Sequence, residues 1–206
     1  GPPRHKTDLR SALSGSIVLL RNKKLIACLV ATVVSCIGFG VFLTFLPLYA
    51  SKLGYDPAQV GLVFAAQAVT NVVGRVPIGN LADRVDRRWL VSAGLICLAV
   101  ALFALGQVAA LPQLLACSVV LGIGMALTFT AIGALIAELV TPLQRGLSMG
   151  MYNSSIYLGM MCGSTVMGLL LHRIGYSYGF ASAGVVALVA LGIFLSMFRE
   201  RPLEVL

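Results

Sequence analysis

Apolar residues follow one another along most of this chain in long, nearly unbroken runs, and they do not alternate with polar residues as in a half-buried strand. Such a run can cross the hydrocarbon core of a bilayer as an α-helix when it reaches ~20 residues. Six runs come near or above this length, at residues 25–49, 58–80, 89–109, 112–139, 147–171 and 178–198. The pattern therefore predicts six membrane-spanning helices.

The boundary between the third and fourth runs depends on one segment, Ala109-Ala110-Leu111-Pro112. A single helix through both runs would hold about 50 apolar residues, far more than a bilayer can cover. We therefore expect a turn in this segment.

The composition agrees with a membrane protein. Hydrophobic residues make up 59% of the 206 residues and charged residues 11%, whereas soluble domains average about 25% charged residues. In lipid the backbone must satisfy its own hydrogen bonds, as helices or as a closed barrel, and continuous apolar runs favour helices. The chain is predicted to be an all-α integral membrane protein, a bundle of six transmembrane helices.

Basic residues predict the topology, because loops on the cytoplasmic side of a membrane are enriched in Lys and Arg. Twelve of the 15 basic residues fall on one side if the runs alternate in direction, which places both termini in the cytoplasm. The net charge of +8 follows from this topology and does not indicate nucleic-acid binding. The twelve are Arg4, Lys6, Arg10, Arg21, Lys23, Lys24, Arg84, Arg87, Arg88, Arg145, Arg199 and Arg201.

The six runs also suggest two inverted three-helix repeats, an arrangement found in many transporters. The first and fourth runs share small-residue patches, Gly38-Phe39-Gly40 and Gly122-Ile123-Gly124. We expect the bundle to occupy residues 25–198, after a cytoplasmic linker or interfacial segment at 1–24. Residues 199–206 are expected to be a cytoplasmic tail, whose last four residues match the start of a common protease tag.

Nothing in the sequence points to an enzyme, a metal or a cofactor. The five cysteines lie within the runs and lack metal-ligand spacing. Gly146-Leu147-Ser148-Met149-Gly150 matches the serine-hydrolase pattern, but it opens a membrane helix, and His172 lies about 36 Å further along. No acidic residue lies in the middle of a run, so we expect any proton coupling to reside outside this chain.

Three motifs resemble the major facilitator superfamily. The charged segment Gly79-Asn80-Leu81-Ala82-Asp83-Arg84-Val85-Asp86-Arg87-Arg88 is similar to that family's helix-linking signature, G-x-L-A-D-R-x-G-R-R/K, with Asp86 in place of the second glycine. Residues 137–146 look like its helix 10–11 junction, and Arg21-Asn22-Lys23-Lys24 looks like its entry to helix 7. The resemblance implies that the chain is the C-terminal half of a twelve-helix transporter.

A cytoplasmic gate, or latch, is the first candidate site. A carboxylate at a helix boundary can accept hydrogen bonds from a helix N-terminus and pair with an arginine in a partly dry junction. The resemblance implies that such pairs close the cytoplasmic side. The alternative is a topology anchor, meaning a solvated charged loop that only fixes the orientation of the chain in the membrane. The candidate latch residues are Gly79, Asp83, Arg84, Arg87, Arg88, Glu138 and Arg145.

A substrate cavity is the second candidate site, because polar side chains at membrane depth usually face a cavity or another helix. Gln67, Asn71 and Arg75 are four residues apart and share one helix face. The alternatives are helix–helix hydrogen bonds and, for Arg75, a side chain that reaches the interface. The candidate cavity residues are Gln67, Asn71, Arg75, Thr128, Tyr152, Asn153 and Tyr157.

We expect a secondary active transporter that moves a small molecule by alternating access, with efflux of a drug or metabolite favoured. The expected partners are membrane lipids, the small-molecule substrate, and either the N-terminal six-helix half of the same transporter or a second copy of this chain. A half-size homodimer and a membrane scaffold or receptor bundle without transport are the alternatives. The expected location is a bacterial inner (plasma) membrane.

Overall fold

The computed structural model describes residue 19 and residues 21–199. The expected tail beyond residue 199, and most of the linker expected at residues 1–24, lie outside the described residues.

All the long elements of the described part are helices. They are α2 (Lys23–Lys52), α3 (Pro57–Ala82), α4 (Arg87–Leu105), α5 (Leu111–Leu139), the short 3₁₀ helix η1 (Pro142–Gln144) and α6 (Arg145–Arg199). Six stretches within residues 21–199 are long and apolar enough to cross a membrane, which confirms the predicted six spans. A turn does separate the third and fourth spans, although α4 ends at Leu105, four residues before the predicted boundary.

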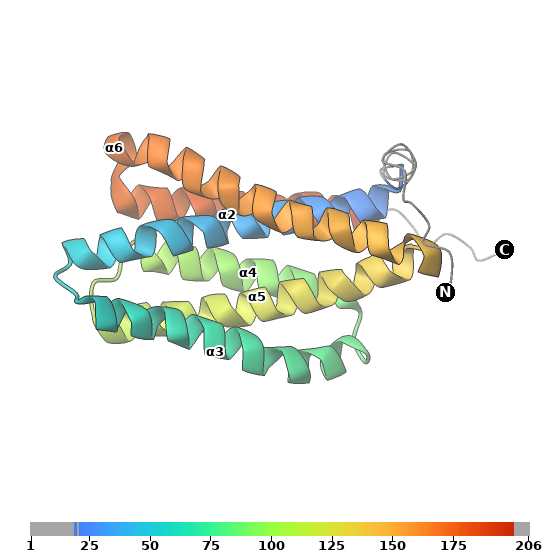
Figure 1. The fold of residues 1–206 in the computed structure, drawn as a ribbon, viewed down its shortest axis with the longest axis horizontal. Helices are drawn as coiled ribbons and strands as arrows, with labels where there is room; N and C mark the ends of the chain where they lie inside the picture. Colours follow the sequence, from blue (N-terminus) through green and yellow to red (C-terminus); the bar gives the residue numbers. More distant parts are fainter. Residues whose placement is uncertain (1–18, 20, 200–206) are drawn as a thin grey trace, which may run out of the picture.

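α6 supplies two of the six spans because it folds back on itself at Gly175. This residue has a φ of 72°, a left-handed conformation that glycine adopts without the clash that a Cβ would cause. We call Pro142–Leu171 the fifth span and Gly175–Phe198 the sixth span. Figure 1 shows this turn at the left end of the bundle.

Successive spans run in opposite directions, so the turns between them gather at the two ends of the bundle (Figure 1). We call the end that holds residues 83–86 and 140–144 the hairpin end; α2 begins and α6 ends there. The opposite end, the far end, holds residues 53–56, 106–110 and Gly175. Two tyrosines tie the far end together: Tyr49 donates a hydrogen bond to the Val108 carbonyl (3.0 Å) and Tyr55 to the Ala109 carbonyl (2.6 Å).

Small residues allow the closest helix contacts, as is common in membranes. A Cβ added at Gly40 of α2 would lie 2.5 Å from the Met160 carbonyl oxygen in the fifth span. A Cβ at Gly122 of α5 would lie 2.6 Å from the Gln67 carbonyl oxygen in α3. The first helix of each three-helix unit thus packs against the second helix of the other, as inverted repeats require.

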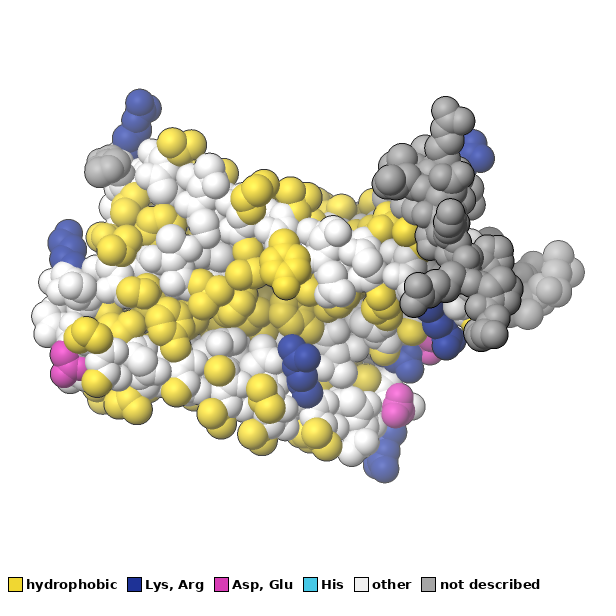
Figure 2. Space-filling view, in the orientation of Figure 1, with side chains coloured by type: hydrophobic (Ala, Val, Ile, Leu, Met, Phe, Trp, Pro, Cys, Tyr) yellow, Lys and Arg dark blue, Asp and Glu magenta, His cyan; other side chains and the backbone are white. Residues whose placement is uncertain are grey.

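Coverage by neighbouring helices is uneven. Of the most apolar 18 residues of each span, 67% are buried in α2, but only 22% in α3 and 17% in the fifth span. Most charged side chains on the visible face lie near its two ends, one basic side chain lies between them, and hydrophobic side chains cover much of the remaining surface (Figure 2). The bundle therefore has its most buried helices in α2, α4 and α5, whereas α3 and the fifth span are largely uncovered.

Candidate functional site

Arg87 is the centre of an ion-pair cluster at the hairpin end. α3 ends at Ala82 with Asp83 as its C-cap, and α4 starts at Arg87 after a short loop. Arg87 Nη2 lies 3.6 Å from Asp83 Oδ1, and Arg87 Nη1 forms an ion pair with Glu138 in the last turn of α5. The Arg87 side chain is only 19% exposed, against 75% for Asp83 and 60% for Glu138. The arginine therefore joins the α3–α4 loop to α5.

The structure brings together only part of the predicted latch. Arg84 and Arg145 are both exposed, and neither is among the residues that pair with Asp83 or Glu138. An added side chain at Gly79 would meet no atom within 4 Å. Arg87 Nε is buried without a hydrogen-bond partner in the described part of the chain. Buried donors are nearly always paired, so this N–H is an exception within the described bundle.

Arg88 belongs to a separate pair. Asp86 caps the start of α4 by accepting a hydrogen bond from the Arg88 backbone N–H (2.9 Å). The Arg88 Nε–H donates to both oxygens of the same carboxylate, at 3.0 and 2.8 Å. These side-chain hydrogen bonds hold the pKa of Asp86 below its ordinary value of 3.8, against the opposing effect of partial burial. Asp86 therefore stays ionised at neutral pH.

The polar residues of α3 differ in their surroundings. Gln67 and Asn71 are buried, facing α5, where Gly122 lets the two helices approach closely. Gln67 donates a hydrogen bond to the Met125 sulfur (3.4 Å). Asn71 accepts one from Arg75 Nε (3.0 Å), and Arg75 itself is exposed. On this face of α3, Gln67 and Asn71 thus contact α5, whereas the cationic Arg75, one turn after Asn71, is exposed.

The other predicted cavity residues are also divided. Thr128 is fully buried where α5 meets Gly94 of α4, and its hydroxyl has no hydrogen-bond partner among the described residues. Tyr152 is partly buried and its hydroxyl lies 3.5 Å from the Phe129 carbonyl oxygen of α5. Asn153 is exposed, and Tyr157 is 71% exposed. Arg75, Asn153 and Tyr157 therefore lie on the uncovered helices, whereas Thr128 lies within a helix contact.

Sequence reasoning missed one polar pair. Thr44 of α2 and Ser164 of the fifth span share a hydrogen bond of 2.7 Å between their hydroxyl oxygens, and Ser164 also donates to the Gly40 carbonyl (3.3 Å). Thr44 is exposed although it lies within a long apolar helix. Isolated hydroxyls in apolar runs carry no spacing signal, so only the fold could bring these two residues together.

Comparison with known proteins identifies the fold's family. Residues 28–205, which are most of the chain, match the sequence profile of the Major Facilitator Superfamily. The chain belongs to this superfamily. Its members are transporters and not enzymes, so the serine-hydrolase-like pattern at residues 146–150 has no catalytic meaning here.

Individual superfamily members are similar over most of this chain. It is 30% identical to the sodium-dependent phosphate transport protein 1 of Arabidopsis thaliana chloroplasts, over 77% of this chain and 31% of that protein. This chain is 24% identical to the staphylopine export protein of Staphylococcus aureus, over 88% of this chain and 46% of that protein. A bacterial homologue of the human lysosomal transporter Spinster has the same fold, with a TM-score of 0.73 at 20% identity, over 89% of this chain and 45% of that structure.

The chain spans less than half the length of these relatives. Membership and the six apolar spans make it an integral membrane protein. The described bundle corresponds to one half of the superfamily's architecture.

Proposed function

We propose that this chain forms one six-helix half of a secondary active transporter, which moves a small molecule across the membrane by alternating access. The observation that carries this proposal is the polar character of the uncovered helices. Arg75 in α3 and Asn153 and Tyr157 in the fifth span are exposed at membrane depth. A charged or amide side chain facing lipid is costly, so these residues favour a water-filled cavity or a second bundle over a lipid-facing surface.

The proposed partner is the N-terminal half of the same protein. The chain covers 46% of the staphylopine exporter and 45% of the Spinster homologue, which leaves room in those relatives for a second bundle of similar size. A second copy of this chain is the alternative partner. The molecular mass of the purified intact protein, compared with its gene length, separates the two arrangements.

Cysteine accessibility in the intact protein tests the cavity. In a background from which all native cysteines of the intact protein are removed, Asn153→Cys should react with a membrane-impermeant maleimide at least tenfold faster than Val100→Cys. Val100 is a matched control because it is 55% exposed on α4, among apolar neighbours. Equal, slow reaction at both positions would mean that Asn153 faces lipid, and the cavity would be refuted.

Export is the direction that we favour, since one relative is named an export protein, although another is named a sodium-dependent phosphate transport protein. A bacterial inner membrane remains the proposed location. Mass spectrometry of cells with and without the intact protein tests the direction. Export predicts a compound that rises in the medium and falls in the cytosol, whereas the reverse shift would mean import.

A further inference from the structure

Arg75 places a positive charge at membrane depth on the uncovered helix α3. Among residues 21–199 it is the only basic residue that lies more than one helical turn from an end of its span. Eight residues separate it from Asp83, the C-cap of α3, which corresponds to about 12 Å along the helix axis. Figure 2 shows one basic side chain between the two ends of the visible face.

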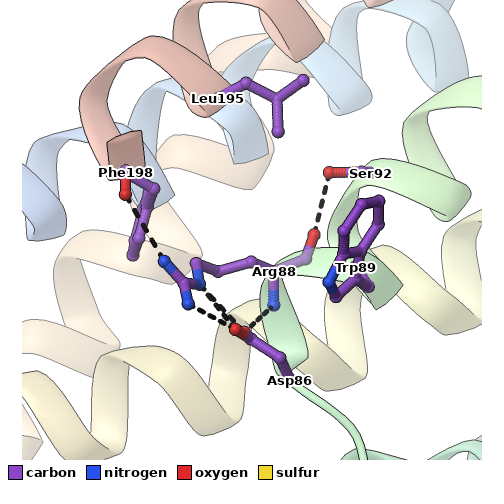
Figure 3. Close-up of a pocket in the computed structure, with 6 residues that line it drawn as sticks. All are labelled: Asp86, Arg88, Trp89, Ser92, Leu195 and Phe198. Carbon is purple, nitrogen blue, oxygen red and sulfur yellow. Dashed lines mark hydrogen bonds and ion pairs between the residues drawn. The ribbon is translucent and has the colours of Figure 1, made fainter. Parts of the chain in front are cut away.

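The described bundle offers this charge no acidic partner. Its four acidic residues all lie at helix ends or cap them, and none forms an ion pair with Arg75. Arg87 and Arg88 differ in this respect, since both are paired with acids; Figure 3 shows the bonds between Arg88 and Asp86. An uncompensated charge at membrane depth is costly, so we expect a counter-charge from outside the described residues. The four acids are Asp56, Asp83, Asp86 and Glu138.

A hydrogen bond turns the guanidinium toward the middle of the span. Arg75 Nε donates to Asn71 Oδ1 at 3.0 Å, and Asn71 lies one turn nearer the far end. This direction agrees with the general lean of helical side chains toward the N-terminus of their helix. An arginine that only reached for the headgroups would extend toward the nearer end, which is the hairpin end. The bond to Asn71 therefore keeps the charge within the span.

The outer edge of the guanidinium is open to a ligand. Of its five N–H groups, only Nε–H has a hydrogen-bond partner among the described residues. The N–H groups on Nη1 and Nη2 can bind two oxygens of one carboxylate or phosphate side by side. Tyr152 of the fifth span lies within electrostatic range of Arg75. Its hydroxyl is 3.5 Å from the Phe129 carbonyl oxygen, a long bond that a better acceptor can replace.

We propose that Arg75 binds the anionic group of the transported molecule, a carboxylate or a phosphate, and that Asn71 positions the guanidinium for it. The Tyr152 hydroxyl donates a further hydrogen bond to the same group. This inference rests on the proposed function, because it gives the substrate of that cavity a chemical class. The bound anion supplies the counter-charge that the bundle lacks, so the substrate is an anion and not a neutral or cationic molecule.

Thiol reagents of opposite charge measure the charge of Arg75. Val72→Cys is placed in the intact protein from which all native cysteines are removed; Val72 is 67% exposed and lies about one turn from Arg75 toward the far end. The ratio of its rates with anionic sulfonatoethyl and cationic trimethylammonioethyl methanethiosulfonate is recorded. We expect Arg75→Gln to lower this ratio about tenfold, because a unit charge about 6 Å away in water changes each rate about threefold, in opposite directions.

Arg173→Gln is the matched control for this measurement. It removes the same charge from an exposed arginine at the far end, next to the turn at Gly175, and it should leave the ratio unchanged. Arg75→Lys keeps the charge but has no fork of two parallel donors. It should therefore keep the reagent ratio and restore only part of the transport that Arg75→Gln loses.

The compounds that the intact protein moves test the substrate class. Mass spectrometry of cells with and without the protein identifies compounds whose distribution between cytosol and medium depends on it. We expect these compounds to carry a carboxylate or a phosphate. Arg75→Gln should slow their transport about tenfold or more, the effect of losing a charge-assisted hydrogen bond.

The outcomes separate this inference from the proposed function. If Val72→Cys reacts with neither reagent and no compound depends on the protein, the transport cavity is refuted and the anion site with it. A reagent ratio that is independent of Arg75 would mean that an acid of the other half or a lipid phosphate already pairs with it. That result, a neutral or cationic substrate, or an anion moved equally well by a folded, monodisperse Arg75→Gln protein would overturn the anion site and leave the cavity intact.

Discussion

Replacing Arg87 should disturb the hairpin end far more than replacing either of its acidic partners. Two unit charges 3.6 Å apart, the separation of Arg87 and Asp83, attract by ~5 kcal/mol at an effective dielectric constant of about 20. The Asp83 side chain is 75% exposed, however, so water screens the pair to about 0.5 kcal/mol. Asp83→Asn should therefore shift a conformational equilibrium only about twofold.

Arg87→Gln removes both ion pairs from the side chain that is least exposed in the cluster. A combined loss of about 1–2 kcal/mol corresponds to a five- to thirtyfold change in the equilibrium. If the cluster closes the hairpin end in one state of the transport cycle, Arg87→Gln should populate the state that is open at this end. Glu138→Gln should have an intermediate effect, because Arg87 keeps Asp83 as a partner.

The alkylation rate of Gly150→Cys measures this opening in the intact protein without native cysteines. Gly150 is exposed near the hairpin end of the fifth span, and an added Cβ there meets no atom within 4 Å. We expect Arg87→Gln to raise the rate about tenfold, while Arg84→Gln, which alters an exposed arginine of the same loop, leaves it unchanged. Unchanged alkylation and unchanged transport in Arg87→Gln would refute the latch and leave a topology anchor.

Three further results are expected. Gly159→Ala should lower the midpoint of thermal unfolding in detergent by several degrees, because its Cβ would collide with a backbone carbonyl of α2, whereas Gly150→Ala should not. Cysteines at Gln144 and Asp56 should label from opposite sides of the membrane, and labelling from the same side would contradict the six-span topology. Glu138→Gln should leave the pH dependence of substrate binding unchanged, since the described acids lie at helix ends; a shifted dependence would place the coupling site in this chain.

Much of the fold was predictable from the sequence because membrane insertion imposes a simple length rule. The six spans follow from apolar runs and the turns from breaks in them, even at the weak break before Pro112. The ends were less accurate. α4 stops at Leu105 although residues 106–109 include apolar side chains, because Gly106 packs against Ser177 and Phe180 of α6 and the chain turns there.

The candidate sites were only partly predictable. Asp83 and Arg87 have the four-residue spacing of a helical pair, but a loop separates α3 from α4, so the sequence could not say which arginine pairs with which acid. Arg88 turned out to pair with Asp86, outside the Arg87 cluster. Side-chain type also failed to distinguish Thr128, which is buried between helices, from Thr44, which is exposed. Burial depends on helix rotation, and nearly uniform apolar runs hold little information about rotation.

Reciprocal accessibility at the two ends of the bundle tests alternating access most directly. Thr44→Cys reports on the far-end half of α2, and Gly150→Cys reports on the hairpin end of the fifth span. Alternating access predicts that Arg87→Gln raises the alkylation rate at Gly150→Cys and lowers it at Thr44→Cys in the same intact protein. Rates that rise together, or that both stay constant while transport is lost, would contradict a transporter whose two ends open in turn.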